Sequence, residues 1–360
     1  MSENKDASRS VRPVSFDREY YRRVIQDNGY DPNVFEGFTQ DIPSIPREDL
    51  EKVFLCHQGL YNFTEALGKK AVLTGFGLSG VPHMGTLAQI NRISMLNRAG
   101  FPAEVVLGDL DAYNGKLTTR DQTTQYADQY QKFIEGTELL DPDTSRVRNQ
   151  SDYPEVLKTA YLLGRFIEDA DLDGAEEDLH DFYTKHGKVD SSMTYRRKLS
   201  LNLMLADFIH LGQTNPNVLV MLGLDEHQYV RAGQDLSKRV DPYVSGLQPV
   251  TIDSLYTPII AGLNGYPKMS KSFKDSSIDL DMSPDDIQGT ILGEKDTHQS
   301  PEESVVYQMA CGIGLGESAS LEEARQAALN PGSREWTQIK TLLIGRVAMF
   351  SNIWKEASIS

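Results

Sequence analysis

Residues able to do chemistry lie in three short stretches of the chain. The first, residues 75–80, matches the G-x-G-x-x-G pattern of phosphate-binding turns and follows a short apolar segment. The match is weak by itself, because Pro82 interrupts the helix that a dinucleotide fold requires, and Asp109 and Asp111 come later than its acidic residue should. An NAD-dependent dehydrogenase is therefore a rival interpretation from another enzyme class.

The second stretch, residues 81–86, places His83 and Gly85 at the mouth of the helix that follows. Glycine lets a nucleotide approach the backbone closely, and the positive end of a helix dipole favours phosphate charge. An imidazole there can donate a hydrogen bond to a phosphate oxygen on which charge builds up. A histidine that only caps a surface helix explains the same residue equally well.

The third stretch, residues 265–272, is a loop with glycine and proline at its start and with Lys268 and Lys271 among hydroxyl side chains. Two ammonium groups on such a loop suit closure over a triphosphate. A solvated turn would not require this composition. Together with His83 and Gly85, the loop indicates a nucleotide site.

Strands and helices are predicted to alternate around these stretches. Apolar segments predict strands at 71–74, 103–108, 218–224 and about 248–252. Sequence patterns predict helices at 16–28, 47–67, 87–98, 121–135, 153–168, 195–211 and 226–239. The alternation predicts an α/β fold with a Rossmann-like parallel sheet, whose active residues lie at the carboxyl ends of the strands.

The expected organisation has four parts. Residues 1–14 are expected to be a mobile tail, 15–68 an N-terminal helical extension, and 69–272 a catalytic domain with a helical insertion at about 115–212. A small helical domain is expected over residues 273–360, with helices at 321–328 and 334–355. Ser283 and Ser300 are expected helix caps, because each precedes a proline and two acidic residues.

The second and third stretches resemble HIGH and KMSKS, the signatures of class I aminoacyl-tRNA synthetases, in the tryptophanyl and tyrosyl subgroup. Residues 83–86 read His-Met-Gly-Thr, and residues 268–272 read Lys-Met-Ser-Lys-Ser. The resemblance extends from about residue 16 to residue 291. Residues 73–77 of the chain are similar to eukaryotic and archaeal tryptophanyl enzymes, whereas residues 108–113 look more like archaeal tyrosyl enzymes.

This resemblance implies a ligase that activates an amino acid with ATP, with Mg²⁺ carried by the nucleotide and no metal site of its own, and that transfers the acyl group to tRNA. The amino-acid carboxylate attacks the α-phosphate in line, so catalysis is positioning and charge stabilisation. The implied catalytic residues are His83, Thr86, Lys268 and Lys271. The implied ATP-binding residues are Gly75, Phe76, Gly77, His83, Gly85, Thr86, Gly223, Asp225, Lys268, Met269, Ser270, Lys271 and Ser272.

The implied amino-acid pocket departs from both subgroups. Leu73 and Glu226 stand where a tyrosine and a glutamine are expected, and Met204 replaces a polar residue, whereas Asp207 matches the tyrosyl pattern. Each lost hydrogen-bonding partner costs about 1–3 kcal/mol. With Asp111, these carboxylates favour an amino acid with an added positive charge; a one-residue misalignment over a normal aromatic pocket is the alternative. The amino-acid-binding residues expected here are Leu73, Asp109, Asp111, Met204, Asp207, Glu226 and Gln228.

The chain is acidic, with 36 basic and 52 acidic residues and a formal net charge of −16. A protein whose affinity rests on many phosphate contacts should be basic, and residues 273–360 hold 14 acidic against 7 basic residues. We expect tRNA to be held by local contacts such as Arg196, Arg197 and Lys198. The alternatives are a paralogue that activates a non-standard amino acid for a non-tRNA acceptor in specialised metabolism, and a non-catalytic sensor, against which the lysine loop argues.

The remaining features bear on location and partners. Cys56 and Cys311 lie far apart without metal-ligand spacing, which favours a reducing cytoplasm. No apolar run is long enough for a membrane span and the polar N-terminus is no secretory signal. The resemblance implies a homodimer. Residues 169–174 mimic a calcium loop, but His180 stands where a glutamate should, so a solvated acidic segment is favoured over a calcium site.

Overall fold

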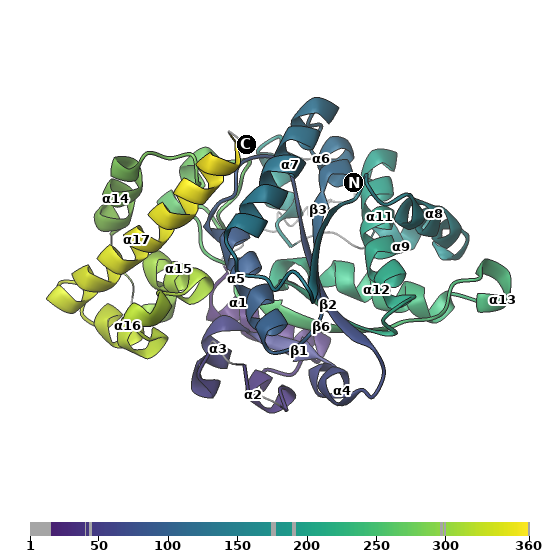
Figure 1. The fold of residues 1–360 in the computed structure, drawn as a ribbon, viewed down its shortest axis with the longest axis horizontal. Helices are drawn as coiled ribbons and strands as arrows, with labels where there is room; N and C mark the ends of the chain where they lie inside the picture. Colours follow the sequence, from purple (N-terminus) through teal and green to yellow (C-terminus); the bar gives the residue numbers. More distant parts are fainter. Residues whose placement is uncertain are drawn as a thin grey trace, which may run out of the picture.

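The computed structural model describes residues 16–39, 41–42, 45–173, 178–188, 192–295, 298 and 300–358. The expected mobile tail at residues 1–14 lies outside them, as do Gly174 and Glu176 of the acidic segment. A six-stranded sheet forms the centre of the molecule, with helices on both sides of it (Figure 1). No helix in the described ranges is both long and apolar enough to cross a membrane.

The sheet has the order β1-β6-β5-β2-β3-β4. Only β1 runs antiparallel to its neighbour, and the other pairs are parallel. The strands are β1 (Cys56–Gln58), β2 (Lys70–Gly77), β3 (Ala103–Gly108), β4 (Ser145–Asn149), β5 (Asn217–Gly223) and β6 (Thr251–Thr257). The predicted α/β fold with a Rossmann-like parallel sheet is confirmed.

Side chains of the central strands point alternately to two hydrophobic clusters, one on each side of the sheet. Val72 and Val105 join one cluster, whereas Leu73 and Val106 join the other. A strand buried on both faces reads as a continuous apolar run, which is why these strands are visible in the sequence. The helices around the sheet are α5 (Met84–Arg98), α6 (Asp109–Gly115), α7 (Arg120–Gly136), α8 (Pro154–Leu163), α9 (Asp169–Asp173), α10 (His180–Lys185), α11 (Tyr195–Gly212), α12 (His227–Arg239) and α13 (Pro242–Ser245).

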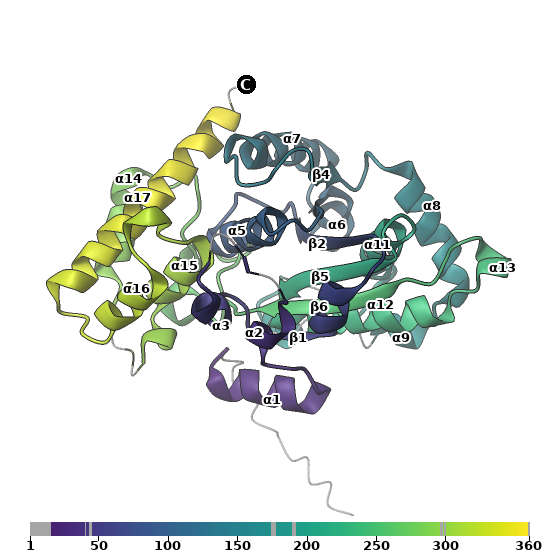
Figure 2. The same ribbon diagram turned by 60° about the horizontal axis from the view of Figure 1, so that its bottom comes forward.

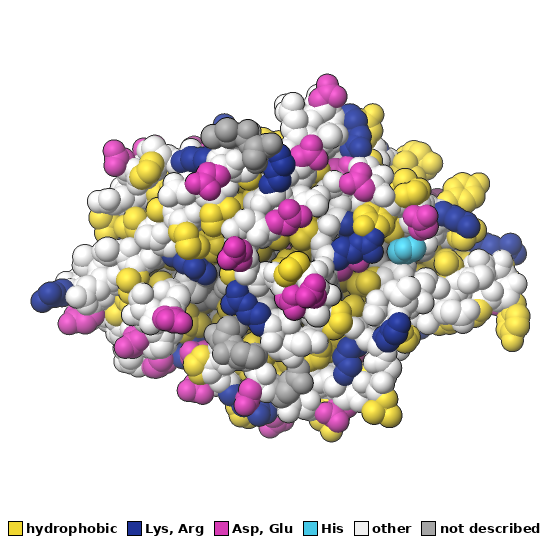
Figure 3. All heavy atoms as spheres, viewed as in Figure 1, with side chains coloured by type: hydrophobic (Ala, Val, Ile, Leu, Met, Phe, Trp, Pro, Cys, Tyr) yellow, Lys and Arg dark blue, Asp and Glu magenta, His cyan; other side chains and the backbone are white. Residues whose placement is uncertain are grey.

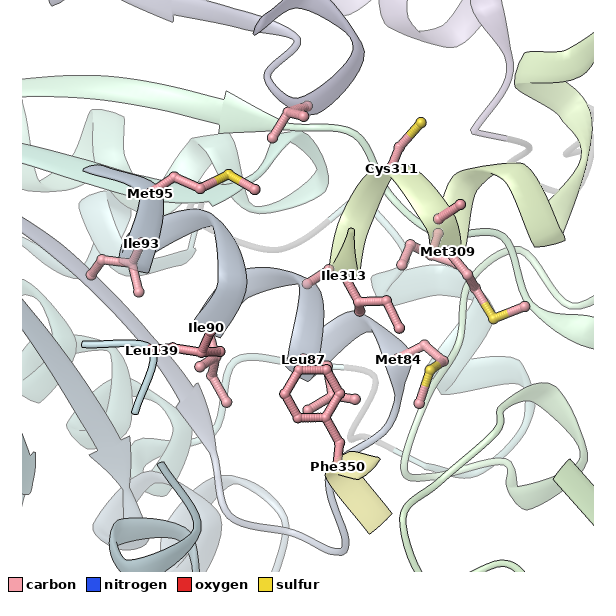
Figure 4. Close-up of a cluster of buried hydrophobic side chains, with 14 of the residues drawn as sticks. Met84, Leu87, Ile90, Ile93, Met95, Leu139, Met309, Cys311, Ile313 and Phe350 are labelled. Carbon is pink, nitrogen blue, oxygen red and sulfur yellow. The ribbon is translucent and has the colours of Figure 1, made fainter. Parts of the chain in front are cut away.

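The chain after the lysine loop forms four helices, which lie together beside the sheet on the left of Figure 1. They are α14 (Pro284–Gly293), α15 (Val305–Ile313), α16 (Leu321–Ala328) and α17 (Arg334–Ala357). Figure 4 shows how they join the core: Leu87 and Ile90 of α5 lie in one cluster with Ile313 of α15 and Phe350 of α17. As expected, Ser283 caps α14, but Ser300 precedes only a short 3₁₀ turn and makes no side-chain cap.

The N-terminal region differs from the expectation at one place. Its helices are α1 (Arg18–Asn28), α2 (Val34–Gly37), α3 (Leu50–Val53) and α4 (Leu60–Glu65), and α1 lies below the sheet in Figure 2. The predicted helix at 47–67 is wrong, because β1 interrupts it and pairs with β6 at the edge of the sheet. Gly59, with φ of 80°, then reverses the backbone in a conformation that glycine adopts readily.

The sequence patterns also missed β4, which lies inside the expected helical insertion. Its residues, Ser-Arg-Val-Arg-Asn, carry two arginines in five positions, so an apolar run is absent. Pairing with β3 at the edge of the sheet forms this strand regardless of its local composition. It brings the buried Arg148 beside Asp207, a residue that lines the cavity described below.

The acidic segment that resembled a calcium loop begins with α9. Lys198 Nζ of α11 lies 2.8 Å from Asp169 Oδ1 and 2.9 Å from Asp173 Oδ1. Arg239 Nη1 of α12 lies 2.8 Å from Asp171 Oδ2. These three carboxylates therefore hold α9 against neighbouring helices.

Candidate active site

A cavity of about 360 Å³ lies at the carboxyl ends of the parallel strands. Its lining residues come from both sides of β2 in the strand order, and we call these two groups of residues the wings of the cavity. One wing comprises lining residues at the ends of β5 and β6, which Gln89 and Arg92 of α5 contact, and the other comprises lining residues at the ends of β3 and β4 together with residues of α11. The lysine loop, residues 265–272, completes the wall. The cavity is lined by every ATP-binding residue expected from the sequence, namely Gly75, Phe76, Gly77, His83, Gly85, Thr86, Gly223, Asp225, Lys268, Met269, Ser270, Lys271 and Ser272.

His83 both caps α5 and faces the cavity. Its Nδ1 accepts a hydrogen bond from the backbone N–H of Gly85 at 3.0 Å, so the ring proton of the neutral imidazole is on Nε2. Burial, with Lys271 and Lys268 nearby, lowers the pKa of His83 to about 3. The imidazole is thus neutral at pH 7, with its Nε2–H left as a donor. The two interpretations of this residue, helix cap and cavity donor, are compatible.

The two loop lysines contact opposite walls of the cavity. Lys268 Nζ lies 2.6 Å from Asp225 Oδ2, beyond the end of β5. Lys271 Nζ donates to the carbonyl oxygen of Gly77, at the end of β2, over 2.7 Å. Burial, with Lys116 nearby, lowers the pKa of Lys271 to about 7. A positive charge at Lys271 is therefore only half-populated near neutral pH until an anion stabilises it.

Close approach explains two of the glycines. A Cβ at Gly77 would lie 2.9 Å from Asp111 Oδ2, and one at Gly85 would lie 2.9 Å from the His83 ring. A side chain at either position would displace a group that lines the cavity. The loop itself is held by Ser270, whose hydroxyl accepts from Tyr183 at 3.1 Å and whose N–H donates to Ser276 Oγ at 3.0 Å.

A buried ionic network lies behind the wing over β3 and β4, and only Asp207 and Gln150 of its members line the cavity. Arg148 Nη2 donates to Asp207 Oδ1 at 2.7 Å, and Arg148 Nε donates to Glu104 Oε1 at 2.7 Å. Gln150 Nε2 donates to Asp207 Oδ2 at 2.9 Å. Burial raises the pKa of Asp207 to about 6, so that it is mostly ionised at pH 7 beside the guanidinium. Leu73, Asp111, Met204 and Glu226 also line the cavity, as expected.

Arg148 changes the argument for a cationic amino acid. Asp207 was expected to bring negative charge to the pocket, but the buried Arg148 pairs with it. Asp207 therefore adds less to a net negative field than the sequence suggested. The order of the sheet brings β4 beside β3, and no local pattern gave this pairing.

Two expected amino-acid-binding residues do not line the cavity. Asp109 is 1% exposed and forms an ion pair with Arg120 Nη1 at 2.6 Å, while it also accepts from the N–H of Ser151. Gln228 contacts His227, which is itself buried against the Tyr30 hydroxyl at 2.9 Å. The first turns of α6 and α12 place these side chains away from the cavity, which corrects the expectation.

The sequence reasoning missed several cavity residues. Arg92 and Gln89 follow Gly85 on one face of α5, Lys116 follows α6, and Tyr183 comes from α10. The helical spacing of Gly85, Gln89 and Arg92 was a usable signal, since residues i, i+4 and i+7 share a face. Lys116 and Tyr183 carried no such signal, because their segments reach the cavity only through the tertiary fold.

The N-terminal helix α1 contacts the rim of this site through two tyrosines. The Tyr21 hydroxyl accepts from the N–H of Ile259 at 3.0 Å, and Ile259 lines the cavity. The Tyr20 hydroxyl donates to Asp178 Oδ2 at 2.6 Å, and the N–H of Asp178 donates to the carbonyl oxygen of Asp225. The extension is therefore tied to the end of β5 and to the chain after β6.

The basic run at 196–198 is engaged inside the protein. Arg196 Nη1 donates to the carbonyl oxygen of Asn114 at 2.8 Å, Arg197 lines the cavity, and Lys198 pairs with α9. On the face shown in Figure 3, Lys and Arg side chains lie in small groups between carboxylates, without one continuous basic band. Among the described residues, no group of three or more His, Cys, Asp or Glu side chains is arranged to hold a metal ion.

Comparison with known proteins agrees with this architecture. The profile of the family "tRNA synthetases class I (W and Y)" matches residues 66–292, more than half of the chain. A tryptophan–tRNA ligase of Aeropyrum pernix is 24% identical over 280 residues, which cover 74% of this chain and 69% of that protein. A tyrosine–tRNA ligase of Methanocaldococcus jannaschii is 26% identical over 235 residues, which cover 62% of this chain and 65% of that protein.

The likeness extends to solved structures. The crystal structure of tryptophanyl-tRNA synthetase from Aeropyrum pernix K1 superposes with a TM-score of 0.66 at 20% identity, and covers 94% of this chain and 96% of that one. At this level of identity the superposition establishes a shared fold.

Proposed function

The chain belongs to the class I tRNA synthetases of the W and Y group, and from this premise we propose that it activates an amino acid with ATP and transfers it to tRNA. The observation that carries the proposal is that His83, Lys268 and Lys271 line one cavity, although they come from the start of α5 and from a distant loop. A neutral donor and two ammonium groups in one cavity suit a triphosphate whose charge shifts during reaction.

The proposed reaction needs no general base. An oxygen of the amino-acid carboxylate forms a bond to the α-phosphorus, the bond from that phosphorus to the bridging oxygen breaks, and pyrophosphate leaves with the electron pair. His83 donates its Nε2–H to a phosphate oxygen. Lys268 and Lys271 exchange their contacts with Asp225 and Gly77 for phosphate oxygens, and the Mg²⁺ that arrives with ATP shares the charge.

We assign the two wings of the cavity to the two substrates. Asp225 and Gly223, beyond β5, are proposed to contact the ribose, with the base in the wing over β5 and β6. The amino acid is proposed to occupy the wing over β3 and β4, where Leu73 and Met204 supply apolar surface and Asp111, Asp207 and Glu226 supply carboxylates. Thr86 is proposed to assist His83 as a hydroxyl donor.

We propose the same domain boundaries that were expected from the sequence. Residues 69–272 are proposed as the catalytic domain, with 15–68 as an N-terminal extension and 273–360 as a C-terminal domain. We propose a homodimer acting in the cytoplasm. Light scattering on the purified full chain gives the mass directly, and a monomeric mass at working concentration would overturn the dimer.

The first experiment is ATP–pyrophosphate exchange with each of the twenty standard amino acids. The proposal expects exchange with at least one of them, and loss of that exchange in Lys271→Ala. Lys238→Ala is the matched control, because Lys238 is an exposed lysine on α12 that does not line the cavity. Turnover with tyrosine or tryptophan alone would end the hypothesis of a cationic substrate. No exchange with any amino acid would contradict activation of a standard amino acid.

The acceptor is tested separately by filter binding to total tRNA at low salt, followed by aminoacylation. Retention and charging support the proposal. One observation favours the second candidate, a non-tRNA acceptor: Arg196 and Lys198, expected to read tRNA, are bonded within the protein. Exchange activity without tRNA retention would favour that candidate.

A further inference from the structure

Arg92 is a buried cation at the cavity wall, on the face of α5 that also carries Gly85 and Gln89. Only 2% of its surface is exposed. In the described part of the chain its guanidinium makes one hydrogen bond, from Nη1 to the carbonyl oxygen of Pro258 at 3.4 Å. Its Nε has no partner there, and no described carboxylate forms an ion pair with it.

The ionisable groups nearest to Arg92 do not supply a counter-charge. Burial raises the pKa of the Cys311 thiol to about 12, and burial also holds the pKa of the Tyr21 hydroxyl above its usual range. Both groups are neutral at pH 7. Burial lowers the pKa of Arg92 to about 10, so the guanidinium remains charged. A buried charge is costly unless it is paired or fully hydrogen-bonded, so an acceptor on a ligand would offset the cost at Arg92.

The position of Arg92 identifies which part of a ligand would reach it. It lies on α5 nine residues beyond His83, and its hydrogen bond to Pro258 places it in the wing over β5 and β6. Thr257, Ile259 and Ile260, at and after the end of β6, also line this wing. Apolar side chains with one planar cation suit a flat heterocycle that presents an acceptor at its edge.

We propose that Arg92 donates a hydrogen bond to a ring nitrogen of the purine base of ATP and so determines specificity for the nucleotide. The inference rests on the proposed function, because it takes the triphosphate at His83 and the lysines as the fixed end of the substrate. It adds a base-reading residue that the signature motifs do not include.

The test compares ATP with 1-deaza-, 3-deaza- and 7-deaza-ATP, each of which lacks one ring nitrogen. With the wild-type protein, one analogue is expected to bind roughly 10- to 100-fold more weakly than ATP, as for a lost bond to a charged group. In Arg92→Met, the dissociation constant of ATP is expected to rise to the value that wild type shows for this analogue. The dissociation constant of the analogue itself should be the same in Arg92→Met as in wild type. Dissociation constants are measured by calorimetry with Mg²⁺ and no amino acid.

A second measurement separates this role from a structural one. Arg92→Met removes an uncompensated buried charge, so its thermal midpoint without nucleotide is expected to rise. Arg92→Lys retains the charge without the planar fork and is expected to reduce the analogue's penalty without abolishing it. If all three analogues bind wild type as tightly as ATP, or if the loss in Arg92→Met is equal for ATP and every analogue, the proposal is overturned.

The design also distinguishes failure of the proposed function. Mg-ATP binding with the expected analogue pattern, but no exchange with any amino acid, would overturn amino-acid activation and support Arg92 as the base-reading residue. Exchange activity with no analogue discrimination would overturn only the role of Arg92. Absence of Mg-ATP binding would overturn both.

Discussion

Lys268 Nζ lies 2.6 Å from Asp225 Oδ2, and this contact joins the lysine loop to the end of a central strand 43 residues earlier in the chain. Asp225 is 3% exposed, so the pair is shielded from water on the carboxylate side. The contact holds the first loop lysine beside the proposed ribose site. In the proposed reaction Lys268 moves to a phosphate oxygen, which leaves the Asp225 carboxylate to accept from a ribose hydroxyl.

Replacing the Asp225 carboxylate should change the KM for ATP and leave the KM for the amino acid nearly unchanged. Asp225→Asn retains a side chain of similar shape but loses the charge, and we expect the KM for ATP to rise roughly tenfold, the size of one charge-assisted hydrogen bond. The KM for the amino acid should stay within about twofold. Exchange kinetics with each substrate varied in turn measure both. An unchanged KM for ATP would contradict the assignment of Asp225.

The two roles of His83 are separable by substitution. Asparagine is a good helix cap, so His83→Asn should keep the thermal midpoint near wild type while kcat falls roughly 100- to 1,000-fold, because the Nε2–H donor is lost. His83→Ala also removes the cap and should cost a further stability loss of about 0.5–2 kcal/mol. Denaturant unfolding and exchange kinetics are measured on both variants. Full activity in His83→Asn would refute its role as a donor.

ATP binding should draw a proton from solution through Lys271. With a pKa of about 7, the amine is mostly neutral at pH 8, and an anionic triphosphate raises its pKa and favours the ammonium form. We expect uptake close to one proton at pH 8 and less at pH 6. Calorimetry in two buffers with different ionisation enthalpies measures it. Lys271→Arg is the control, because arginine remains charged; equal uptake in that variant would assign the proton elsewhere.

Asp253 on β6 should oppose folding at neutral and alkaline pH. Its Oδ2 has no hydrogen-bond partner among the described residues, and burial raises its pKa to about 7. A carboxyl group whose pKa is higher in the folded state binds its proton more tightly there, so stability falls as pH rises from about 4 through about 7. Asp253→Asn should therefore stabilise the protein at pH 8 by roughly 1–3 kcal/mol, with the gain shrinking toward pH 4.

Asp109→Asn is the matched comparison for that experiment. Asp109 is buried with an arginine partner, so its loss should destabilise the protein at pH 8, in the opposite direction to Asp253→Asn. Thermal unfolding followed at pH 5 and pH 8 gives both differences. A destabilising effect of Asp253→Asn at pH 8 would show that its carboxylate is compensated.

The two motifs at the proposed phosphate end of the cavity could be located from the sequence, because each is defined by residues close together in the chain. His83 caps α5 through a hydrogen bond to a residue only two positions away, and the lysine loop stands out by its own composition. Strands such as β3 could be recognised in the sequence as continuous apolar runs, because both faces of the sheet are covered. The periodicity and spacing of neighbouring residues were therefore sufficient to predict the fold class and to locate both motifs.

The tertiary structure alone decided which charges meet. Asp207 was visible in the sequence, but Arg148 belongs to a strand with no apolar run and reaches Asp207 only because β4 pairs with β3. Lys198 was expected to contact tRNA, and in the structure it forms an ion pair with Asp169 of α9. Burial and counter-ions depend on strand order and helix packing, which bring distant residues within a few ångströms, and no spacing along the chain encodes those distances.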